Sequence, residues 1–297
     1  MKAFIIKGYG GPDKLEEAEV PVPAAGSGES LVRIRATTVN PADLKWRAGM
    51  FDAFSPLSFP HILGNDVAGE VVEGEEFAPG TRVLAKLFKG TYAEYVAVPC
   101  ALIAIIPDEV DLKTAAAVGT GGLTGFQMIE KGLDVQAGER VLLTGALGAV
   151  GRACLYAAKR RGAHVVAAVR GNQLEQALAA GADEALVLDD DSWTGEPFDD
   201  VVDTVGGPDV ARLCRNLKTG GRILTAATTP IEGDDLPAKP EFYAVVPSGA
   251  DLAGVMEAVA TGGLEVPIAH VLPLSEVAHA HRLMESGGVG GKIVLTP

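Results

Sequence analysis

Three glycines at three-residue spacing carry the clearest chemical signal in the sequence. An apolar strand, Val141–Thr144, runs into Gly145, Gly148 and Gly151, and a helical pattern follows them. Glycines let backbone N–H groups approach a pyrophosphate, and a helix N-terminus favours its negative charge. The spacing is Gly-x-x-Gly-x-x-Gly rather than the usual Gly-x-Gly-x-x-Gly, but the strand–turn–helix context agrees with a dinucleotide-binding turn. We predict that this turn comprises Gly145, Ala146, Leu147, Gly148, Ala149, Val150 and Gly151.

The end of the next expected strand decides which dinucleotide the turn would hold. NAD-binding folds usually place an Asp or Glu there, which binds the ribose 2′-hydroxyl. The stretch 165–172 has no carboxylate and carries Arg170 and Asn172 instead. An arginine can meet a 2′-phosphate through a charge-assisted hydrogen bond. We therefore predict NADPH as the cofactor; the alternative is that Arg170 is an ordinary solvated side chain.

Two patterns divide the chain into domains. Residues 1 to about 117 contain short apolar runs typical of strands, at 1–7, 30–38, 67–73, 82–86 and 92–98, with a short helical piece at 42–49. Further on, strands alternate with helices, which predicts βαβ units and a parallel sheet. Its six expected strands are 140–144, 164–169, 185–188, 200–205, 222–226 and 242–246. A helix at 251–260 follows the sixth strand, and a final strand at 292–296 lies outside this sheet.

These patterns predict an α/β protein with a discontinuous second domain. A doubly wound domain with a six-stranded parallel sheet would span residues 118–263, and residues 1–117 and 264–297 would form the other domain. Two domains suit a chain of 297 residues.

Charge and composition exclude several classes of partner. The chain carries 25 basic and 39 acidic residues, a formal net charge of −14, so it would repel nucleic-acid phosphates. We expect no signal peptide, and no apolar run approaches the roughly 18 residues of a membrane span. Three widely spaced cysteines fit a reducing compartment. We expect a cytoplasmic homodimer without nucleic-acid or membrane partners.

The chain also resembles the zinc-independent, ζ-crystallin-like quinone oxidoreductases of the medium-chain dehydrogenase/reductase superfamily. The similar segments are Met1–Phe4, Gly10–Pro12, Thr37–Asp43, Gly64–Gly69, Gly90–Tyr95, Ala115–Gly125, Asp203–Gly207, Gly220–Arg222 and Gly291–Leu295. The resemblance implies a GroES-like β domain, a Rossmann domain and a cleft between them that holds the nicotinamide.

The resemblance also implies roles for particular residues. Asn40 would contact the nicotinamide side of the cofactor, Thr124 would lie near the carboxamide, and Lys292 would close over the cofactor. Asp43, Lys45 and Trp46 flank Asn40, and we expect them to face the substrate, Trp46 by stacking on a flat ring. The remaining expected cofactor contacts are Thr204, Val205, Ala226 and Val246.

Zinc is not expected in this chain. Zinc alcohol dehydrogenases of the superfamily carry a Cys near position 40 and Gly-His-Glu near position 65. This chain has Asn40 and Gly64–Asn65–Asp66 there, and it lacks the closely spaced cysteines of a structural zinc lobe. We therefore predict that no metal ion is bound.

Without a metal, the chemistry expected is direct hydride transfer to an electrophilic small molecule. A quinone needs little acid–base help, because the cofactor supplies the hydride and the protein supplies orientation. We expect NADPH-dependent reduction of a quinone-type acceptor, and no essential proton donor; Tyr92 and Tyr243 are weaker candidates for one. Three alternatives remain: reduction of activated C=C bonds in enals, enones or enoyl thioesters, a non-catalytic NADPH-binding protein, and a zinc alcohol dehydrogenase.

Overall fold

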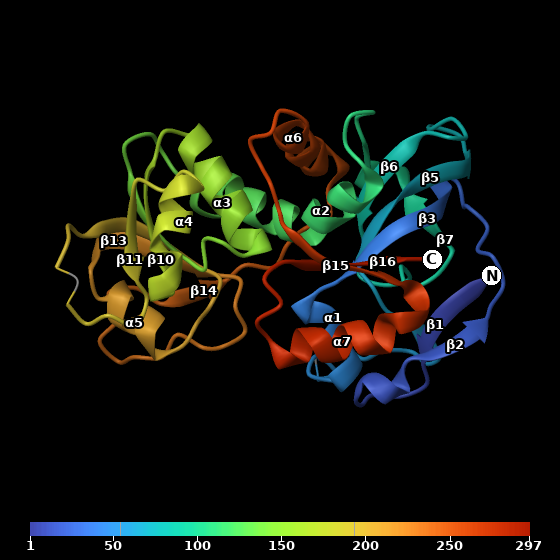
Figure 1. The fold of residues 1–297 in the computed structure, drawn as a ribbon, viewed down its shortest axis with the longest axis horizontal. Coiled ribbons are helices and arrows are strands. Elements are labelled where there is room, and N and C mark those ends of the chain that lie inside the picture. Colours follow the sequence, from blue (N-terminus) through green and yellow to red (C-terminus); the bar gives the residue numbers. More distant parts are fainter. Residues whose placement is uncertain (54, 193) are drawn as a thin grey trace. The chain divides into compact units, whose positions relative to one another are not determined.

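The computed structural model describes residues 1–53, 55–192 and 194–297. The chain forms two compact units (Figure 1), which we call the β unit and the α/β unit. The β unit comprises Met1–Thr120 and Pro247–Pro297, and the α/β unit comprises Gly121–Val246. The α/β fold class is as predicted.

The second domain boundary differs from the expected position between residues 263 and 264. Helix α6 (Gly249–Ala260) belongs to the β unit. The reason is close packing on strand β8 (Ile103–Ile105): a Cβ atom on Gly249 would lie only 2.3 Å from the carbonyl oxygen of Ile103. The sequence pattern predicts that strand 242–246 and helix 251–260 form one more strand–helix pair of the parallel sheet. In the structure the helix, α6, packs on the sheet of the β unit instead.

The β unit is built on a sheet of seven strands among its described residues, in the order β15-β16-β3-β5-β6-β8 with β7 also paired to β3. These strands are β3 (Glu29–Val39), β5 (Asp66–Gly74), β6 (Arg82–Lys86), β7 (Tyr95–Pro99), β8, β15 (Ile268–Pro273) and β16 (Lys292–Thr296). A smaller sheet has the order β2-β1-β4, with β1 (Lys2–Ile6), β2 (Glu16–Glu19) and β4 (His61–Ile62). The helices are α1 (Pro41–Ala48), α6 and α7 (Val277–Ser286), with 3₁₀ turns at Pro12–Lys14, Cys100–Leu102 and Leu274–Glu276.

Strand β3 positions the most polar part of this unit. It pairs with β5, β7 and β16, so it is central to the sheet. Its last residues, Thr37 to Val39, are all buried, whereas the middle of the strand alternates between buried and exposed. Asn40, the residue that follows, therefore emerges inside the unit rather than on its surface.

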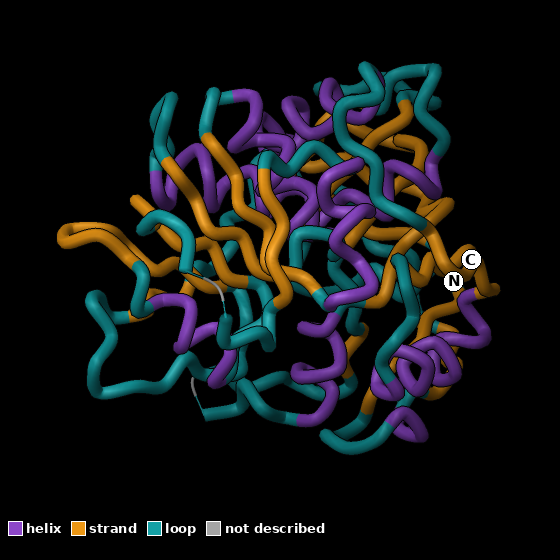
Figure 2. Tube along the Cα trace, turned by 60° about the vertical axis from the view of Figure 1, so that its left-hand side comes forward, coloured by secondary structure: helices purple, strands orange, loops and turns teal. Residues whose placement is uncertain are grey.

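The α/β unit contains a parallel sheet in the order β11-β10-β9-β12-β13-β14, which confirms the predicted six-stranded sheet; its strands lie side by side in Figure 2. The strands are β9 (Arg140–Thr144), β10 (His164–Val169), β11 (Glu184–Val187), β12 (Phe198–Asp203), β13 (Leu217–Thr225) and β14 (Pro240–Phe242). The helices are α3 (Ala149–Arg160), α4 (Leu174–Ala179) and α5 (Pro208–Cys214), with a 3₁₀ turn at Gly171–Gln173.

Alternating residues of β9 and β10 cover the two faces of this sheet. Val141 and Leu143 pack in the core formed with α3, whereas Leu142 packs in the core formed with α5. Strand β14 is shorter than the predicted strand 242–246 and ends at Phe242.

Helix α2 (Leu112–Gln127) was not predicted, because its sequence is rich in Ala and Gly. The glycines allow a close approach: a Cβ on Gly121 would lie 2.8 Å from the Cβ of Ala149, and one on Gly125 would lie 2.3 Å from the carbonyl oxygen of Val150. A π-helix, Met128–Leu133, continues α2. None of the helices in the described part of the chain combines the length and apolarity needed to cross a bilayer.

Candidate functional site

The three glycines of the predicted turn, Gly145, Gly148 and Gly151, differ in whether the fold itself requires a glycine. Gly145 has a φ of +63°, and a Cβ there would lie 2.3 Å from the Thr204 hydroxyl oxygen. A Cβ on Gly151 would lie 2.1 Å from the carbonyl oxygen of Gly145. At Gly148, by contrast, the nearest atom is that same oxygen, at 3.4 Å. Gly145 and Gly151 are therefore required by the fold, and Gly148 leaves open space beside the turn.

Gly148 is also the N-cap of α3. The first N–H groups of a helix have no partner within the helix, and they carry the positive end of its dipole. Ala149 and Val150, which supply the first such groups, are only half-buried, whereas Ala146 is buried and Leu147 packs on the core. Gly148 therefore leaves an approach to these N–H groups that no side chain fills, which is the arrangement that an anion such as a pyrophosphate requires.

A buried carboxylate fixes the loops beside this turn. Asp203, at the end of β12, accepts hydrogen bonds from the hydroxyls of Thr144 and Thr225, both 2.5 Å, and from the N–H groups of Val205 and Gly206, both 2.9 Å. Asp203 thus ties three strand ends together. Asp203 begins the family-like segment Asp203–Gly207, but nothing in the sequence alone indicates this role.

Thr204 and Val205, both predicted to contact the cofactor, follow Asp203 directly. The Thr204 hydroxyl donates to the Thr144 carbonyl at 2.9 Å, and Val205 is 38% exposed. Ala226 comes directly after β13 and donates its N–H to the Asp203 carbonyl at 2.9 Å. These three residues and the glycine turn therefore gather at the carboxyl ends of the strands, where open α/β sheets bind ligands.

Other predicted cofactor residues of this unit lie further along the chain. Thr124 is buried within α2. Val246 lies beyond the end of β14 and is 61% exposed, and its backbone is held by the Gln127 side chain at 2.8 and 3.0 Å. Arg170 and Asn172 are both exposed at the end of β10. The structure gives Arg170 no ion-pair partner among the residues it describes, so its guanidinium is available to an anion.

In the β unit, Asn40 has a side chain that is fully engaged with other residues. Its amide nitrogen donates to the Asp66 carboxylate at 2.9 Å and to the Thr38 hydroxyl at 3.2 Å. Its amide oxygen accepts from the Lys292 ammonium at 2.6 Å, and Lys292 also donates to the Val39 carbonyl. Both Asn40 and Lys292 are buried. The structure therefore brings these two predicted residues together, across 252 positions of the sequence.

Asp66 is the acceptor on which this cluster converges. Besides Asn40 it accepts hydrogen bonds from the Thr38 hydroxyl and from both the N–H and the hydroxyl of Thr120, at 2.6 and 2.7 Å. It is completely buried. In the sequence Asp66 stands out only as part of Gly64–Asn65–Asp66, where zinc enzymes have Gly-His-Glu, and no local signal marks it as the centre of a network.

Asp43, predicted to face the substrate, is buried and holds the Asn40 segment. Its carboxylate accepts from the Asn40 N–H at 2.8 Å and from the Asn65 amide at 2.6 Å. Burial raises the pKa of Asp43 to about 7, with a smaller contribution from the charge of Asp66. Lys45 is half-buried, which lowers its pKa, and Trp46 packs edge-on against Phe51 at a centroid distance of 4.9 Å.

A chain of hydrogen bonds connects Arg47 of α1 to Tyr92 through His281 of helix α7. An Arg47 guanidinium nitrogen donates to His281 Nδ1 at 2.9 Å, and His281 Nε2 lies 3.0 Å from the Tyr92 hydroxyl. Burial raises the pKa of Tyr92 well above the usual range, with a smaller contribution from the charge of Asp43. Burial and the Arg47 charge lower the pKa of His281 to about 3. His281 is therefore neutral, and Tyr92 is fully buried and committed to this chain.

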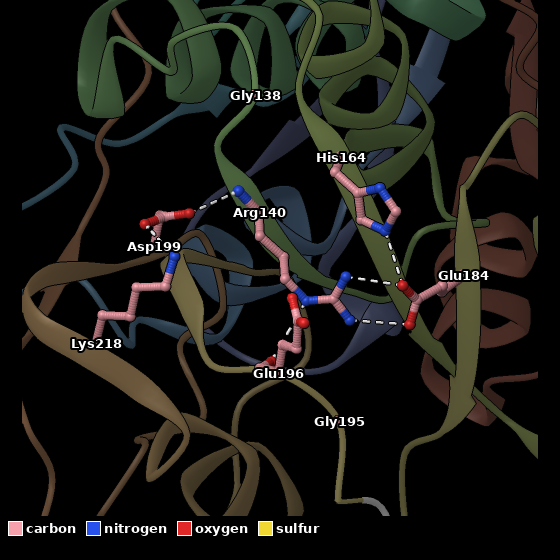
Figure 3. Close-up of a pocket in the computed structure, with 8 residues that line it drawn as sticks. All are labelled: Gly138, Arg140, His164, Glu184, Gly195, Glu196, Asp199 and Lys218. Carbon is pink, nitrogen blue, oxygen red and sulfur yellow. Dashed lines mark hydrogen bonds and ion pairs between the residues drawn. The ribbon is translucent and has the colours of Figure 1, made fainter.

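A cavity of about 610 Å³ lies at the other end of the parallel sheet (Figure 3). Arg140, His164 and Glu184 line it and begin strands β9, β10 and β11. The Arg140 guanidinium binds Glu184 at 2.7 and 2.9 Å, and His164 contacts the same carboxylate at 2.8 Å. None of the predicted site residues lines this cavity; in Figure 3, Arg140 and His164 pair with Glu184, and Lys218 pairs with Asp199.

No group of three or more His, Cys, Asp or Glu side chains that could hold a metal ion is found in residues 1–53, 55–192 and 194–297.

Comparisons with known proteins agree with this architecture. The GroES-like domain family of alcohol dehydrogenases matches residues 26–108, and the zinc-binding dehydrogenase family matches residues 180–295. The chain is 31% identical to the chloroplast envelope quinone oxidoreductase homolog of Arabidopsis thaliana, over 100% of this chain and 98% of that protein.

Two further similarities extend over the whole chain. The NADPH-dependent alkenal/one oxidoreductase of Arabidopsis thaliana chloroplasts is 31% identical, over 100% of this chain and 80% of that protein. Among solved structures, an NAD-dependent alcohol dehydrogenase superposes with a TM-score of 0.87 and 31% identity, covering 100% of both chains.

Proposed function

Since the chain belongs to the medium-chain dehydrogenase/reductase superfamily, in its quinone-oxidoreductase-like group, we propose that it transfers hydride from NADPH to a quinone-type acceptor without a metal ion. It is an oxidoreductase by this membership. The acceptor, the cofactor and the absence of a metal are the parts that we propose.

The observation that carries the proposal is the open face of the turn at Gly148. The α/β unit keeps a Cβ-free approach to the first N–H groups of α3, with Thr204, Val205 and Ala226 on the neighbouring strand ends. The N–H groups of α3 fit the pyrophosphate of a dinucleotide, and the three neighbouring residues lie at the strand ends where open α/β sheets bind ligands. A folded protein needs Gly145 and Gly151 for its own packing, but it has no such need of a glycine at 148.

The choice of NADPH depends on Arg170. Its exposed guanidinium stands at the end of β10, where NAD-binding folds present a carboxylate to the ribose. The relatives differ in their cofactors, since one is NADPH-dependent and another is NAD-dependent. Arg170 is the feature of this chain that favours the 2′-phosphate.

The bound nicotinamide would supply the hydride, and the protein would supply binding and orientation. Asn40 cannot adapt its amide freely, because Asp66, Thr38 and Lys292 fix it. We propose that this rigid segment presents a defined surface to the acceptor, with the half-buried Lys45 and Trp46 nearby on α1. Holding reactants in a fixed geometry can contribute about 7–11 kcal/mol to the lowering of the barrier.

A second candidate is the reduction of activated C=C bonds. One relative with 31% identity over the whole chain is an alkenal/one oxidoreductase. An enone accepts hydride at carbon and develops charge on its oxygen, which is the same electronic demand as that of a quinone.

The test is to mix purified protein with NADPH or NADH and a panel of quinones, enals and enones, and to follow the loss of reduced-nicotinamide absorbance. Turnover of quinones above all other acceptors supports the first proposal, and preference for enals or enones supports the second. No turnover with any acceptor contradicts both.

We also propose that the enzyme binds no zinc, because Asn40 and Asp66 occupy the positions expected for ligands and bond to each other. Elemental analysis of the purified protein should find no stoichiometric zinc, and a chelator should leave turnover unchanged. About one tightly bound zinc per chain would contradict this. A cytoplasmic homodimer remains our proposal for the assembled protein, and light scattering measures its mass.

A further inference from the structure

The buried cluster around Asn40 contains a lysine that sequence reasoning did not single out. Lys86 is the last residue of β6, and it lies directly opposite Asp66 on the neighbouring antiparallel strand. Its side chain is only 2% exposed. The cluster thus buries two carboxylates, Asp43 and Asp66, and two ammonium groups, Lys86 and Lys292.

Three of these four charges are committed to hydrogen bonds. Asp66 accepts from Asn40, Thr38 and Thr120, Asp43 accepts from Asn40 and Asn65, and Lys292 donates to Asn40 and Val39. Within the described residues Lys86 has no hydrogen-bond acceptor. Its Nζ instead lies 3.1 Å from the centroid of the Phe88 ring.

The Lys86 ammonium is not completely enclosed. Every fully enclosed side-chain nitrogen or oxygen among the described residues has a hydrogen-bond partner, and Nζ of Lys86 has none, although its side chain as a whole is only 2% exposed. The Phe88 ring that covers this ammonium is 54% exposed, and exposed side chains change rotamer within nanoseconds. Lys86 therefore offers three N–H donors to a molecule that displaces the ring.

Contrary to the expectation from the sequence that no side chain is an essential proton donor, we infer that Lys86 is the general acid of the reaction, contacting the acceptor oxygen on which negative charge develops. This inference rests on the proposed function. As hydride arrives at a quinone or at the β-carbon of an enone, a hydroquinone monoanion or an enolate forms. An N–H bond of Lys86 then breaks, its proton joins that oxygen, and the neutral amine regains a proton from water. One hydride, which the bound nicotinamide would supply, and one proton enter the acceptor.

The electrostatics of the site agree with this role. Burial lowers the pKa of Lys86 to about 8, and the charges of Asp66 and Asp43 oppose that shift. An acid whose pKa is near the working pH is protonated before the reaction and gives up its proton readily. Lys292, which is held by the Asn40 amide, is not free to approach an acceptor in this way.

The first test needs no cofactor and no turnover. 4-Nitrophenol is the probe, because its phenolate absorbs visible light and resembles the developing oxyanion. Titrated with the apo protein, its apparent pKa should fall by about one unit or more in the wild type and in Lys86→Arg, which keep the cation. It should not change in Lys86→Met. The control is Lys89→Met, an exposed lysine of the same loop, which should behave as the wild type.

The second test separates charge from proton donation. Lys86→Met should lower kcat by roughly a hundredfold or more, and Lys86→Arg should lower it similarly, because an arginine does not release its proton near neutral pH. The wild-type kcat should fall above about pH 8, the pKa of Lys86, and this limb should be absent in both variants. Lys89→Met should keep the wild-type profile.

Two results would overturn the inference. One is an unchanged nitrophenol pKa in the wild type, and the other is near-normal kcat in Lys86→Met. A purely charge-balancing lysine would give this second result together with a loss of stability, measured by urea unfolding. If no acceptor is reduced by the wild type, the proposed function fails, while the nitrophenol titration still decides whether Lys86 binds an oxyanion.

Discussion

Two buried aspartates, one in each unit, accept nearly the same set of hydrogen bonds but differ in the charges that surround them. Asp203 and Asp66 each accept four hydrogen bonds, two of them from threonine hydroxyls. The donors to Asp203 are two threonine hydroxyls and two loop N–H groups. The donors to Asp66 are side chains and backbone of segments distant in sequence, and Lys86 lies opposite it across the strands.

This difference indicates that the surroundings of Asp203 depend on shape and packing, whereas those of Asp66 depend on charge. Around Asp203 every donor is neutral, and the result is a fixed set of strand ends beside an open glycine turn. Around Asp66 two carboxylates and two ammonium groups are buried together, and within the described part of the chain the Lys86 ammonium has no hydrogen-bond partner. The first region should respond to changes of volume or packing, and the second to changes of charge and pH.

Removal of the Asp203 carboxylate should have the largest effect on stability. In Asp203→Ala, two threonine hydroxyls and two N–H groups lose their acceptor in a buried site, and each unsatisfied group costs about 1–3 kcal/mol, not additively. We expect the free energy of unfolding to fall by about 3–5 kcal/mol, measured by urea titration. The control Asp235→Ala removes an exposed ion pair with Arg215 and should change little. An equally small loss for Asp203→Ala would show that the cluster does not hold the strand ends.

A branched side chain at Gly148 should abolish cofactor binding and leave the fold intact. In Gly148→Val the new atoms enter the open space beside the turn, so we expect NADPH affinity to fall by roughly a hundredfold or more, about 2.7 kcal/mol. Isothermal titration measures this, and circular dichroism checks the fold. Gly151→Val should instead disrupt the protein, since its Cβ would meet the Gly145 carbonyl at 2.1 Å. Normal NADPH binding by folded Gly148→Val would remove this turn from the site.

The preference for NADPH should depend on one exposed side chain. Arg170→Ala removes a charge-assisted contact to the 2′-phosphate, worth about 1.5–3 kcal/mol. We expect NADPH to bind roughly ten- to a hundredfold more weakly, and NADH to bind as before. Dissociation constants of both cofactors, measured for both proteins, give the answer. Equal affinities of the wild type for NADPH and NADH would contradict the assignment.

The smallest predicted effect is a pH dependence that comes from Asp43. Its pKa is about 7 in the folded protein, whereas the ordinary value of an Asp carboxyl is 3.8, so between these values the folded state holds a proton that the unfolded state releases. The free energy of unfolding should therefore fall as pH rises across that window, by at most about 1.4 kcal/mol per pH unit. Asp43→Asn should lack this component.

The measurement is the difference between wild type and Asp43→Asn in urea unfolding at several pH values, because His281 contributes a slope of the opposite sign to both proteins. A difference that is constant with pH would show that Asp43 is ionised throughout.

Much of the fold could be predicted from the sequence, because regular patterns come from local contacts. Strands 140–144, 164–169, 82–86 and 292–296 have the bounds that apolar runs and their flanking residues predict. Helix α2 was missed because its Ala and Gly residues show no amphipathic period, although small residues are what its packing on α3 requires. Strand β15 and helix α7 were missed because the pattern after Gly262 is irregular.

The site was predictable only where it is local. The glycine turn can be predicted because all of its residues, 145–151, are consecutive in the sequence. The cluster around Asn40 does not, because residues 40, 66, 86 and 292 meet only through the pairing of β3, β5, β6 and β16. Lys86 looks like an ordinary polar residue at the end of a strand, and only burial without an acceptor distinguishes it.

The hydrogen bonds through His281 have a direction, and that direction limits how the sequence can vary. Arg47 can only donate, so His281 must accept on Nδ1 and carry its proton on Nε2, which then points to Tyr92. Position 281 therefore tolerates only side chains that accept at one end and donate at the other. Homologues that keep Arg47 and Tyr92 should show His or Gln there, and a homologue with Leu or Lys at 281 should have exchanged Arg47 as well.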